Sequence, residues 1–238
     1  MRFIIPALCA FVLLNSCEMN VRNSIRGNGN MTSQTRSVGS FTKVDVSGPF
    51  DVYVTQGAAA AVKVDADENL QQYIEVIVKG DEVNIQTRDH YNLRPRSDIK
   101  IYITSPAYQA LSITGSGNLR SDSKLSTDRI DISVTGSGEM TVNVDAPIVK
   151  SEVTGSGTIR LNGATRRFDA EINGSGEVHA FDLLSEEAGI EINGSGDAEV
   201  FASKTLKIEV SGSGDVQYKG TASVNQSVAG SGNVRKVN

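Results

Sequence analysis

The segment INGSGEV at residues 172–178 decides the fold, because the sequence contains seven variants of it. All of them share the triplet Gly-Ser-Gly, which starts at Gly115, Gly136, Gly155, Gly174, Gly194, Gly212 and Gly230. Successive triplets are separated by 21, 19, 19, 20, 18 and 18 residues. A regular period near 20 residues is typical of a solenoid, in which each repeat packs on its neighbours.

The residues around the triplet predict strands. Val or Ile stands two residues before each first Gly, and an apolar residue stands four residues after it. This alternation has a period of two, as in a strand with one buried face. If the strand continued through the triplet, both Gly residues would face inward and the Ser outward. Coils stacked about 4.8 Å apart would then align the triplets into one narrow seam. The alternative is that each triplet is a turn between two strands. We predict an all-β fold, with a β-helix-like solenoid of about seven repeats over residues 111–238.

Residues 41–110 form a less regular β-rich part. Strands are expected at 50–55 and 99–104, a hairpin at 75–87 and a short helix at 67–73. The segment Ser47-Gly48-Pro49-Phe50 resembles a degenerate triplet, because Val44, Val46, Val52 and Val54 repeat the flanking alternation. It is expected to form the first coil.

The N-terminus has the pattern of an export signal. An apolar run from Phe3 to Leu14 is too short to span a bilayer and has the length of a signal-peptide core. It is followed by Leu14-Asn15-Ser16-Cys17, which resembles a bacterial lipobox. We expect a signal peptide at 1–16, lipid attachment at Cys17 and a flexible tether at 17–40, while an ordinary secretory signal is the alternative. Cys9 would leave with the signal, so the mature chain would keep no free thiol.

Composition restricts the function. The chain has 238 residues, a net charge of -5, two His and no Trp. An acidic protein lacks the basic face that nucleic-acid binding needs. The two histidines, His90 and His179, are interpreted as surface residues, and no catalytic residue, metal site or cofactor is predicted. Calcium binding and polysaccharide cleavage remain alternatives, since four acids share the position three residues after the first Gly: Glu139, Glu177, Asp197 and Asp215.

The central Ser of each triplet gives a candidate binding strip. Thr, Asn or Ser precedes most triplets, so the strip would be rich in hydroxyl and amide groups and could bind a repetitive polymer through many weak contacts. The alternative is that these small polar residues only solvate the surface. The strip consists of Ser116, Ser137, Ser156, Ser175, Ser195, Ser213 and Ser231.

Two segments carry a family resemblance. VDVSGPFDV at 44–52 and ADENL at 66–70 resemble the head GIN domain family of autotransporter-adhesin-like lipoproteins, over about residues 41–237. The resemblance implies a right-handed β-helix-like fold, a cell-envelope location and a role in adhesion.

We therefore expect a non-enzymatic lipoprotein of the cell envelope, anchored in the outer membrane, that acts as an adhesin or surface interaction module. The alternatives are a periplasm-facing binding or sensing module and, third, a polysaccharide-active β-helix enzyme. The expected partners are the membrane, through the lipid anchor, and a glycan or a host or cell-surface protein. An exposed last coil would also allow copies of the chain to associate.

Overall fold

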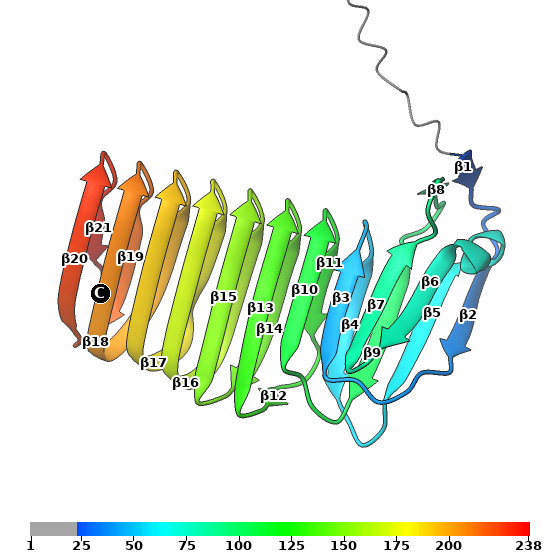
Figure 1. Cartoon of the computed structure of the whole chain (residues 1–238), viewed down its shortest axis with the longest axis horizontal. Coiled ribbons are helices and arrows are strands. Elements are labelled where there is room, and N and C mark those ends of the chain that lie inside the picture. Colours follow the sequence, from blue (N-terminus) through cyan, green and yellow to red (C-terminus); the bar gives the residue numbers. More distant parts are fainter. Residues whose placement is uncertain (1–22) are drawn as a thin grey trace, which may run out of the picture.

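The computed structural model describes residues 23–238 as a β-solenoid with a cap at its N-terminal end (Figure 1). The predicted signal peptide and Cys17 lie outside the described residues. Within residues 23–238, no helix is both long and apolar enough to cross a membrane. The elements are β1 (Asn23–Arg26), β2 (Met31–Arg36), β3 (Lys43–Ser47), β4 (Asp51–Gln56), β5 (Ala61–Asp67), η1 (Glu68–Tyr73), β6 (Ile74–Lys79), β7 (Glu82–Thr87), β8 (Tyr91–Arg94), β9 (Lys100–Ser105), β10 (Ala110–Gly115), β11 (Asn118–Ser121), β12 (Leu125–Ser126), β13 (Arg129–Gly136), β14 (Glu139–Asp145), β15 (Ile148–Gly155), β16 (Thr158–Gly174), β17 (Glu177–Gly194), β18 (Asp197–Gly212), β19 (Val216–Gly220), β20 (Ser223–Gly230) and β21 (Val234–Lys236).

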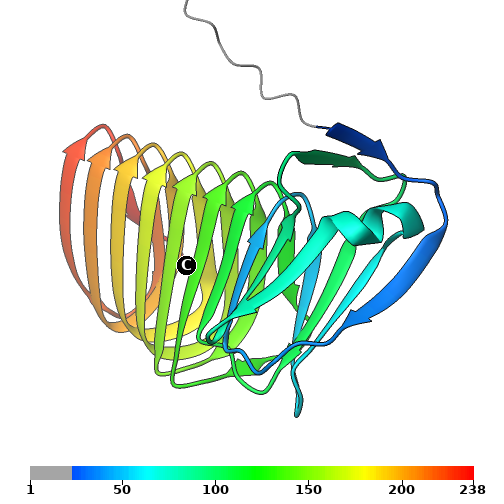
Figure 2. The same ribbon diagram turned by 45° about the vertical axis from the view of Figure 1, so that its right-hand side comes forward.

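Each coil contributes one strand to each of two parallel faces. Sheet 1 contains the strands that lead into a triplet: β3, β10, β13, β15, β20 and the C-terminal parts of β16, β17 and β18. Sheet 2 contains the strands that follow a triplet: β4, β11, β14, β19, β21 and the N-terminal parts of β16, β17 and β18. β16, β17 and β18 bend between the sheets without interruption, which gives the open, curved outline of the coils in Figure 2.

The triplets stack in register, and each is also a corner. Gly136 pairs with Gly115, Gly155 with Gly136, and so on to Gly230 on Gly212. The predicted solenoid and the alignment of its triplets are therefore confirmed. However, the strand ends at the first Gly, whose φ lies between +113° and +140° in all seven copies. The second Gly is buried in six of the seven triplets and the first Gly in none, so the expectation that both glycines face inward is wrong for the first. A positive φ turns the backbone, and Gly adopts it without a steric penalty.

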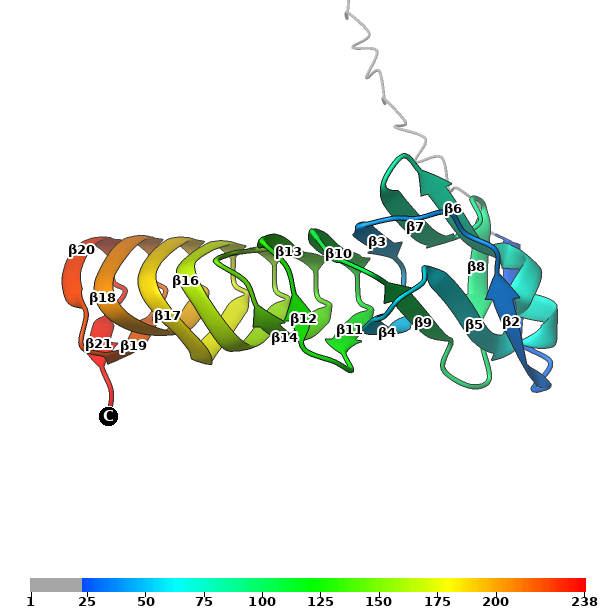
Figure 3. The same ribbon diagram turned by 90° about the horizontal axis from the view of Figure 1, so that it is seen from below.

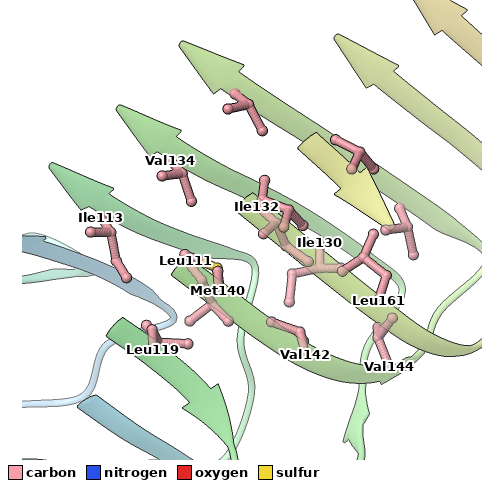
Figure 4. Close-up of a cluster of buried hydrophobic side chains, with 14 of the residues drawn as sticks. Leu111, Ile113, Leu119, Ile130, Ile132, Val134, Met140, Val142, Val144 and Leu161 are labelled. Carbon is pink, nitrogen blue, oxygen red and sulfur yellow. The ribbon is translucent and has the colours of Figure 1, made fainter. Parts of the chain in front are cut away.

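The solenoid interior is filled by ladders of aliphatic side chains. Ile113 lies beside Val134 on neighbouring strands of sheet 1, and Leu119 and Met140 face them from sheet 2 (Figure 4). These side chains belong to one apolar cluster that runs from Phe41 to Val216. Burying one such side chain contributes about 1.5–3 kcal/mol, so the core needs few aromatic residues.

The N-terminal part extends the solenoid and then closes it. β3 and β4 form the predicted coil, with the corner at Gly48 and parallel pairing to β10 and β11, but this coil is not the first in the stack. A further coil, made of β7 and β9, pairs in parallel with β3 and β4 and lacks a triplet. Antiparallel strands then cover this end: β6 lies on β7, β5 on β9 and β2 on β5 (Figure 3). The hairpin predicted at 75–87 is confirmed as β6–β7, and the short helix predicted at 67–73 is confirmed as η1.

The structure corrects the expected tether over residues 23–36. β1 pairs with β8, and β2 pairs with β5 along its whole length. β2 is an edge strand whose sequence MTSQTR is almost entirely polar and mostly exposed. An edge strand held by backbone hydrogen bonds does not require apolar side chains, so its composition resembles that of a linker.

Candidate functional site

The seven triplet serines form a row along one corner of the solenoid, and we call this row the serine ridge. All seven are exposed. The backbone amide of each later serine donates a hydrogen bond of 2.8–2.9 Å to the carbonyl oxygen of the first Gly in the preceding coil. The ridge therefore presents hydroxyl groups from a backbone that is fixed coil by coil.

A second feature lies on the outer face of sheet 1, next to the ridge. An open groove of about 890 Å³ crosses β13, β15, β16, β17, β18 and β20. Three rows of outward side chains line it, at three, five and seven residues before the first Gly of the coils. We call it the outer groove. It was not predicted from the sequence.

Four glutamates occupy one row of the outer groove. Glu152, Glu171, Glu191 and Glu209 lie directly beside one another on adjacent strands. Like charges placed opposite one another are unfavourable in a sheet unless neighbouring groups offset them. All four glutamates stand three residues before the first Gly of a triplet. A comparison of equivalent positions in the repeats, which revealed the acids after the triplet, would also have revealed these glutamates.

Neighbouring donors offset this charge. The side-chain amides of Asn173 and Asn193 donate to Glu171 at 2.8 Å and Glu191 at 3.2 Å. The Nζ of Lys207 lies 2.6 Å from Oε1 of Glu209. The hydrogen bond with this carboxylate, together with the carboxylate's negative charge, raises the pKa of Lys207. Thr154, whose hydroxyl donates to Glu152 at 3.4 Å, and these two asparagines therefore connect the ridge to the groove.

Charges alternate from Asp131 to Lys150 to Asp169 along the second row of the groove, and arginines of the third row form ion pairs with the acids of the second. Arg129 pairs with Asp131 at 3.0 Å, and Arg167 pairs with Asp169 at 2.8 Å, two coils away. Exposed ion pairs of this kind contribute little to stability, typically about 0–1 kcal/mol. Their regular spacing instead gives the surface a repeating polar pattern.

The acids predicted as a ladder on sheet 2 have partners within the protein. Glu139 forms an ion pair with Arg160 at 3.1 Å. His179 lies between two carboxylates, with Nε2 3.0 Å from Glu177 and Nδ1 2.8 Å from Glu199. His179 is half-buried on the outer face, as expected for a surface histidine with acidic neighbours.

The other two acids of that ladder hold the backbone of the next coil. Asp197 accepts a hydrogen bond of 3.0 Å from the amide of Asp215, and Asp215 accepts one of 2.9 Å from the amide of Asn233. Within residues 23–238, no three His, Cys, Asp or Glu side chains come together in a way that could hold a metal ion. Structural hydrogen bonding explains these acidic positions without a cation.

Sheet 2 also carries an aromatic row that was not predicted from the sequence. The rings of Tyr53 and Tyr102 stack with centroids 5.0 Å apart, on adjacent strands β4 and β9. Arg120 lies 4.4 Å from the centroid of the Tyr53 ring, and Lys63 lies 4.1 Å from that of Tyr102. Because a cation or the other ring faces each side of this stack, it does not offer an open platform for a sugar ring.

The fold is a capped β-solenoid with regular polar outer faces. It therefore places this chain in the class of repeat proteins with an extended surface. The family model "Putative auto-transporter adhesin, head GIN domain" matches residues 40–222. The chain belongs to this family.

Solved structures share the fold. A putative lipid binding protein from Parabacteroides distasonis ATCC 8503 is 26% identical, with a TM-score of 0.79, and covers 91% of this chain and 100% of its own. A putative adhesin from the same organism is also 26% identical, with a TM-score of 0.76, 90% of this chain and 100% of its own covered. A putative adhesin from Bacteroides fragilis NCTC 9343 is 24% identical, with a TM-score of 0.85 and the same coverage. No curated protein matches the sequence.

Proposed function

We propose that the protein is a non-enzymatic lipoprotein of the cell envelope, anchored through Cys17, that contacts a glycan or a cell-surface protein with its solenoid. The observation that carries this proposal is the in-register repetition of the serine ridge and of the three rows of the outer groove. Groups repeated on successive coils can engage a repetitive partner at several places at once, so individually weak contacts add up to useful avidity. Membership of an adhesin-like family supports the same role.

The arrangement of the acids supports a binding role rather than catalysis. Glycoside cleavage needs two carboxyl groups across one bond, one of them usually with a raised pKa. The acids beside the triplets are instead engaged in ion pairs or in backbone hydrogen bonds between coils. No cofactor is assigned to the protein.

The location can be tested with single cysteines, because Cys9 and Cys17 are the only cysteines of the chain. Ser175→Cys places a thiol on the exposed ridge, and Val153→Cys places one of similar size in the core, where Val153 is 0% exposed. Intact cells of the producing bacterium are treated with a membrane-impermeant maleimide. Labelling of Ser175→Cys but not of Val153→Cys in intact cells is expected for a surface adhesin. Labelling only after the outer membrane is permeabilised would instead support the periplasm-facing binding or sensing module.

The ridge itself can be tested with charged, bulky substitutions. The triple variant S156R/S175R/S195R fills three successive exposed positions of the ridge. Adhesion of protein-coated beads to host cells or to immobilised glycans is expected to fall about tenfold or more. The control S97R/Q72R/S126R adds the same charge at exposed positions in the N-terminal part and on β12, and it should adhere like the parent. Equal losses in both variants would exclude the ridge as the contact surface.

A further inference from the structure

We propose that three arginines at the N-terminal end of the structure, Arg26, Arg94 and Arg96, form a docking surface for the phosphates of anionic lipid headgroups. The inference rests on the proposed lipid anchor at Cys17, because that anchor would hold this end of the molecule at a membrane. It adds a direct contact between the folded domain and the lipid surface. We call these residues the arginine cluster.

The arginine cluster is built by a small two-stranded sheet. β1 and β8 pair in parallel, and Arg26 lies directly beside Arg94. Hydrogen bonds from Asn23 N to His90 O, 2.8 Å, and from Gly27 N to Arg94 O, 2.9 Å, hold both ends of β1. On the other face Ile25 lies beside Leu93, and both are half-buried. The backbone therefore fixes the two arginines next to each other on the outward face.

Arg96 joins this pair across one hollow. Arg26, Arg94, Pro95 and Arg96 line a single open depression. The amide of Arg96 donates a 3.0 Å hydrogen bond to the buried carboxylate of Asp67, which fixes the backbone just beyond β8. Three arginines thus line one exposed space.

The charge of this cluster is not neutralised within the fold. Among residues 23–238, ion pairs join eleven pairs of basic and acidic side chains, and none of them involves Arg26, Arg94 or Arg96. All three are exposed. Like charges directly opposite one another destabilise a sheet, so Arg26 beside Arg94 is an arrangement that an anion would relieve. Guanidinium groups match phosphate oxygens with paired hydrogen bonds.

The short stretch of chain between Cys17 and β1 keeps this cluster near the proposed anchor. Asn23, the first residue of β1, follows Cys17 by six residues. Six residues span at most about 20 Å when fully extended. A lipid on Cys17 would therefore keep Asn23 within about 20 Å of the headgroups, and Arg26, three residues further along β1, within about 30 Å. The whole chain carries a net charge of -5, so an anionic membrane would repel most of the molecule and attract this end.

Vesicle binding by a protein that lacks the lipid anchor tests the proposal. The chain from residue 17 onward with Cys17→Ser contains every described element and removes both the apolar leader and the acylation site. It is floated with vesicles of phosphatidylcholine containing phosphatidylglycerol, and with pure phosphatidylcholine. We expect binding only to the anionic vesicles and a loss of binding as salt rises. In the same background, R26Q/R94Q/R96Q should bind about a hundredfold more weakly, since each basic residue near such a surface contributes about a fivefold factor.

The matched control is K124Q/R166Q/K236Q, which removes three exposed cations elsewhere on the chain. It should bind like the parent. Equal binding by the arginine variant, or an equal loss in the control, would overturn the proposal. Binding of inorganic phosphate by the parent, with no flotation on anionic vesicles, would also overturn it and identify a free-phosphate site instead. The anchor is tested separately by incorporation of labelled palmitate into the full chain and its Cys17→Ser variant. Failure of that labelling leaves the vesicle result intact.

Discussion

The amide nitrogen of Ser175 lies 2.8 Å from the carbonyl oxygen of Gly155, one coil earlier in the sequence. The equivalent contact links each later triplet to the one before it. The coils therefore meet at this corner through backbone alone. A side chain on the first Gly would stand between the two coils, which explains why the triplet recurs while the residues around it vary.

Gly174→Ala should destabilise the solenoid by about 3 kcal/mol. A Cβ on Gly174 would lie 2.5 Å from the carbonyl oxygen of Gly155, and the φ of Gly174 is +127°. Overpacking costs about 1–3 kcal/mol, and a left-handed backbone costs a non-glycine residue about 1–2 kcal/mol. Urea denaturation measures the loss. Gly39→Ala is the control, since a Cβ there meets nothing within 4 Å, and it should change stability by less than about 0.5 kcal/mol. Equal stability of the two variants would contradict the backbone contact.

Tyr108→Phe should cost about 1–2 kcal/mol at neutral pH. The Tyr108 side chain is buried, and its hydroxyl lies 3.0 Å from the carbonyl oxygens of Thr55 and Ile103. Removing it leaves buried acceptors without their donor. The measurement is the urea midpoint of the variant and the parent at pH 7.

The same residue should make the parent sensitive to high pH. Burial raises the pKa of Tyr108 above the ordinary value near 10, so the folded chain holds a proton that the unfolded chain loses. The parent should therefore lose stability as the pH rises above about 10, and Tyr108→Phe should lose less. Parallel curves for the two proteins between pH 9 and 11 would argue against burial of a neutral phenol.

Asp67→Asn should loosen the N-terminal cap by about 1–3 kcal/mol. The carboxylate is fully buried and accepts hydrogen bonds from two amides, Gly29 N at 2.5 Å and Arg96 N at 3.0 Å. An asparagine side chain has only one acceptor oxygen, so one buried amide loses its partner. Hydrogen exchange at residues 27–29 and 96 should accelerate before the solenoid core exchanges. Glu68→Gln, at the exposed neighbouring residue, is the control and should leave exchange unchanged.

Asp45→Asn should slightly stabilise the protein at pH 7, by well under 1 kcal/mol because the site is half-exposed. Partial burial, and to a smaller extent the charge of Glu82, raise the pKa of Asp45. A raised pKa means that the folded state favours the protonated acid, so the parent loses stability as the pH rises through that pKa. The gain should vanish toward pH 3, where the carboxyl is neutral. Asp128→Asn, an exposed acid, is the control. A gain independent of pH would contradict this explanation.

The sequence predicted the repetitive part well because each coil repeats the same physical requirement. Apolar residues at fixed offsets fill the interior, and Gly is needed where backbones meet at Gly174 and its equivalents. The degenerate corner at Gly48 could be found by the same offsets, although Pro49 replaces the serine. The sequence left open whether the triplets align into a seam or form turns between strands. In the structure each triplet does both.

The N-terminal cap could not be predicted in the same way. β7 and β9 form a coil without a triplet, since the chain between them includes β8 and pairs it with β1. β2 is held by backbone hydrogen bonds to β5, and its polar side chains give no burial signal. The arginine cluster arises from the pairing of residues far apart in sequence, Arg26 and Arg94, which no local pattern reveals.

The in-register stacking of the coils has a consequence for how such a protein can change length. Removing residues 156–174 would join Gly155 directly to Ser175 and restore an intact triplet. Every remaining coil would still find a neighbour with the same corner and the same inward offsets. The gene can therefore gain or lose whole coils, and the molecule can extend its far end toward a partner or withdraw it in steps of one coil, while the cap at the other end keeps its structure.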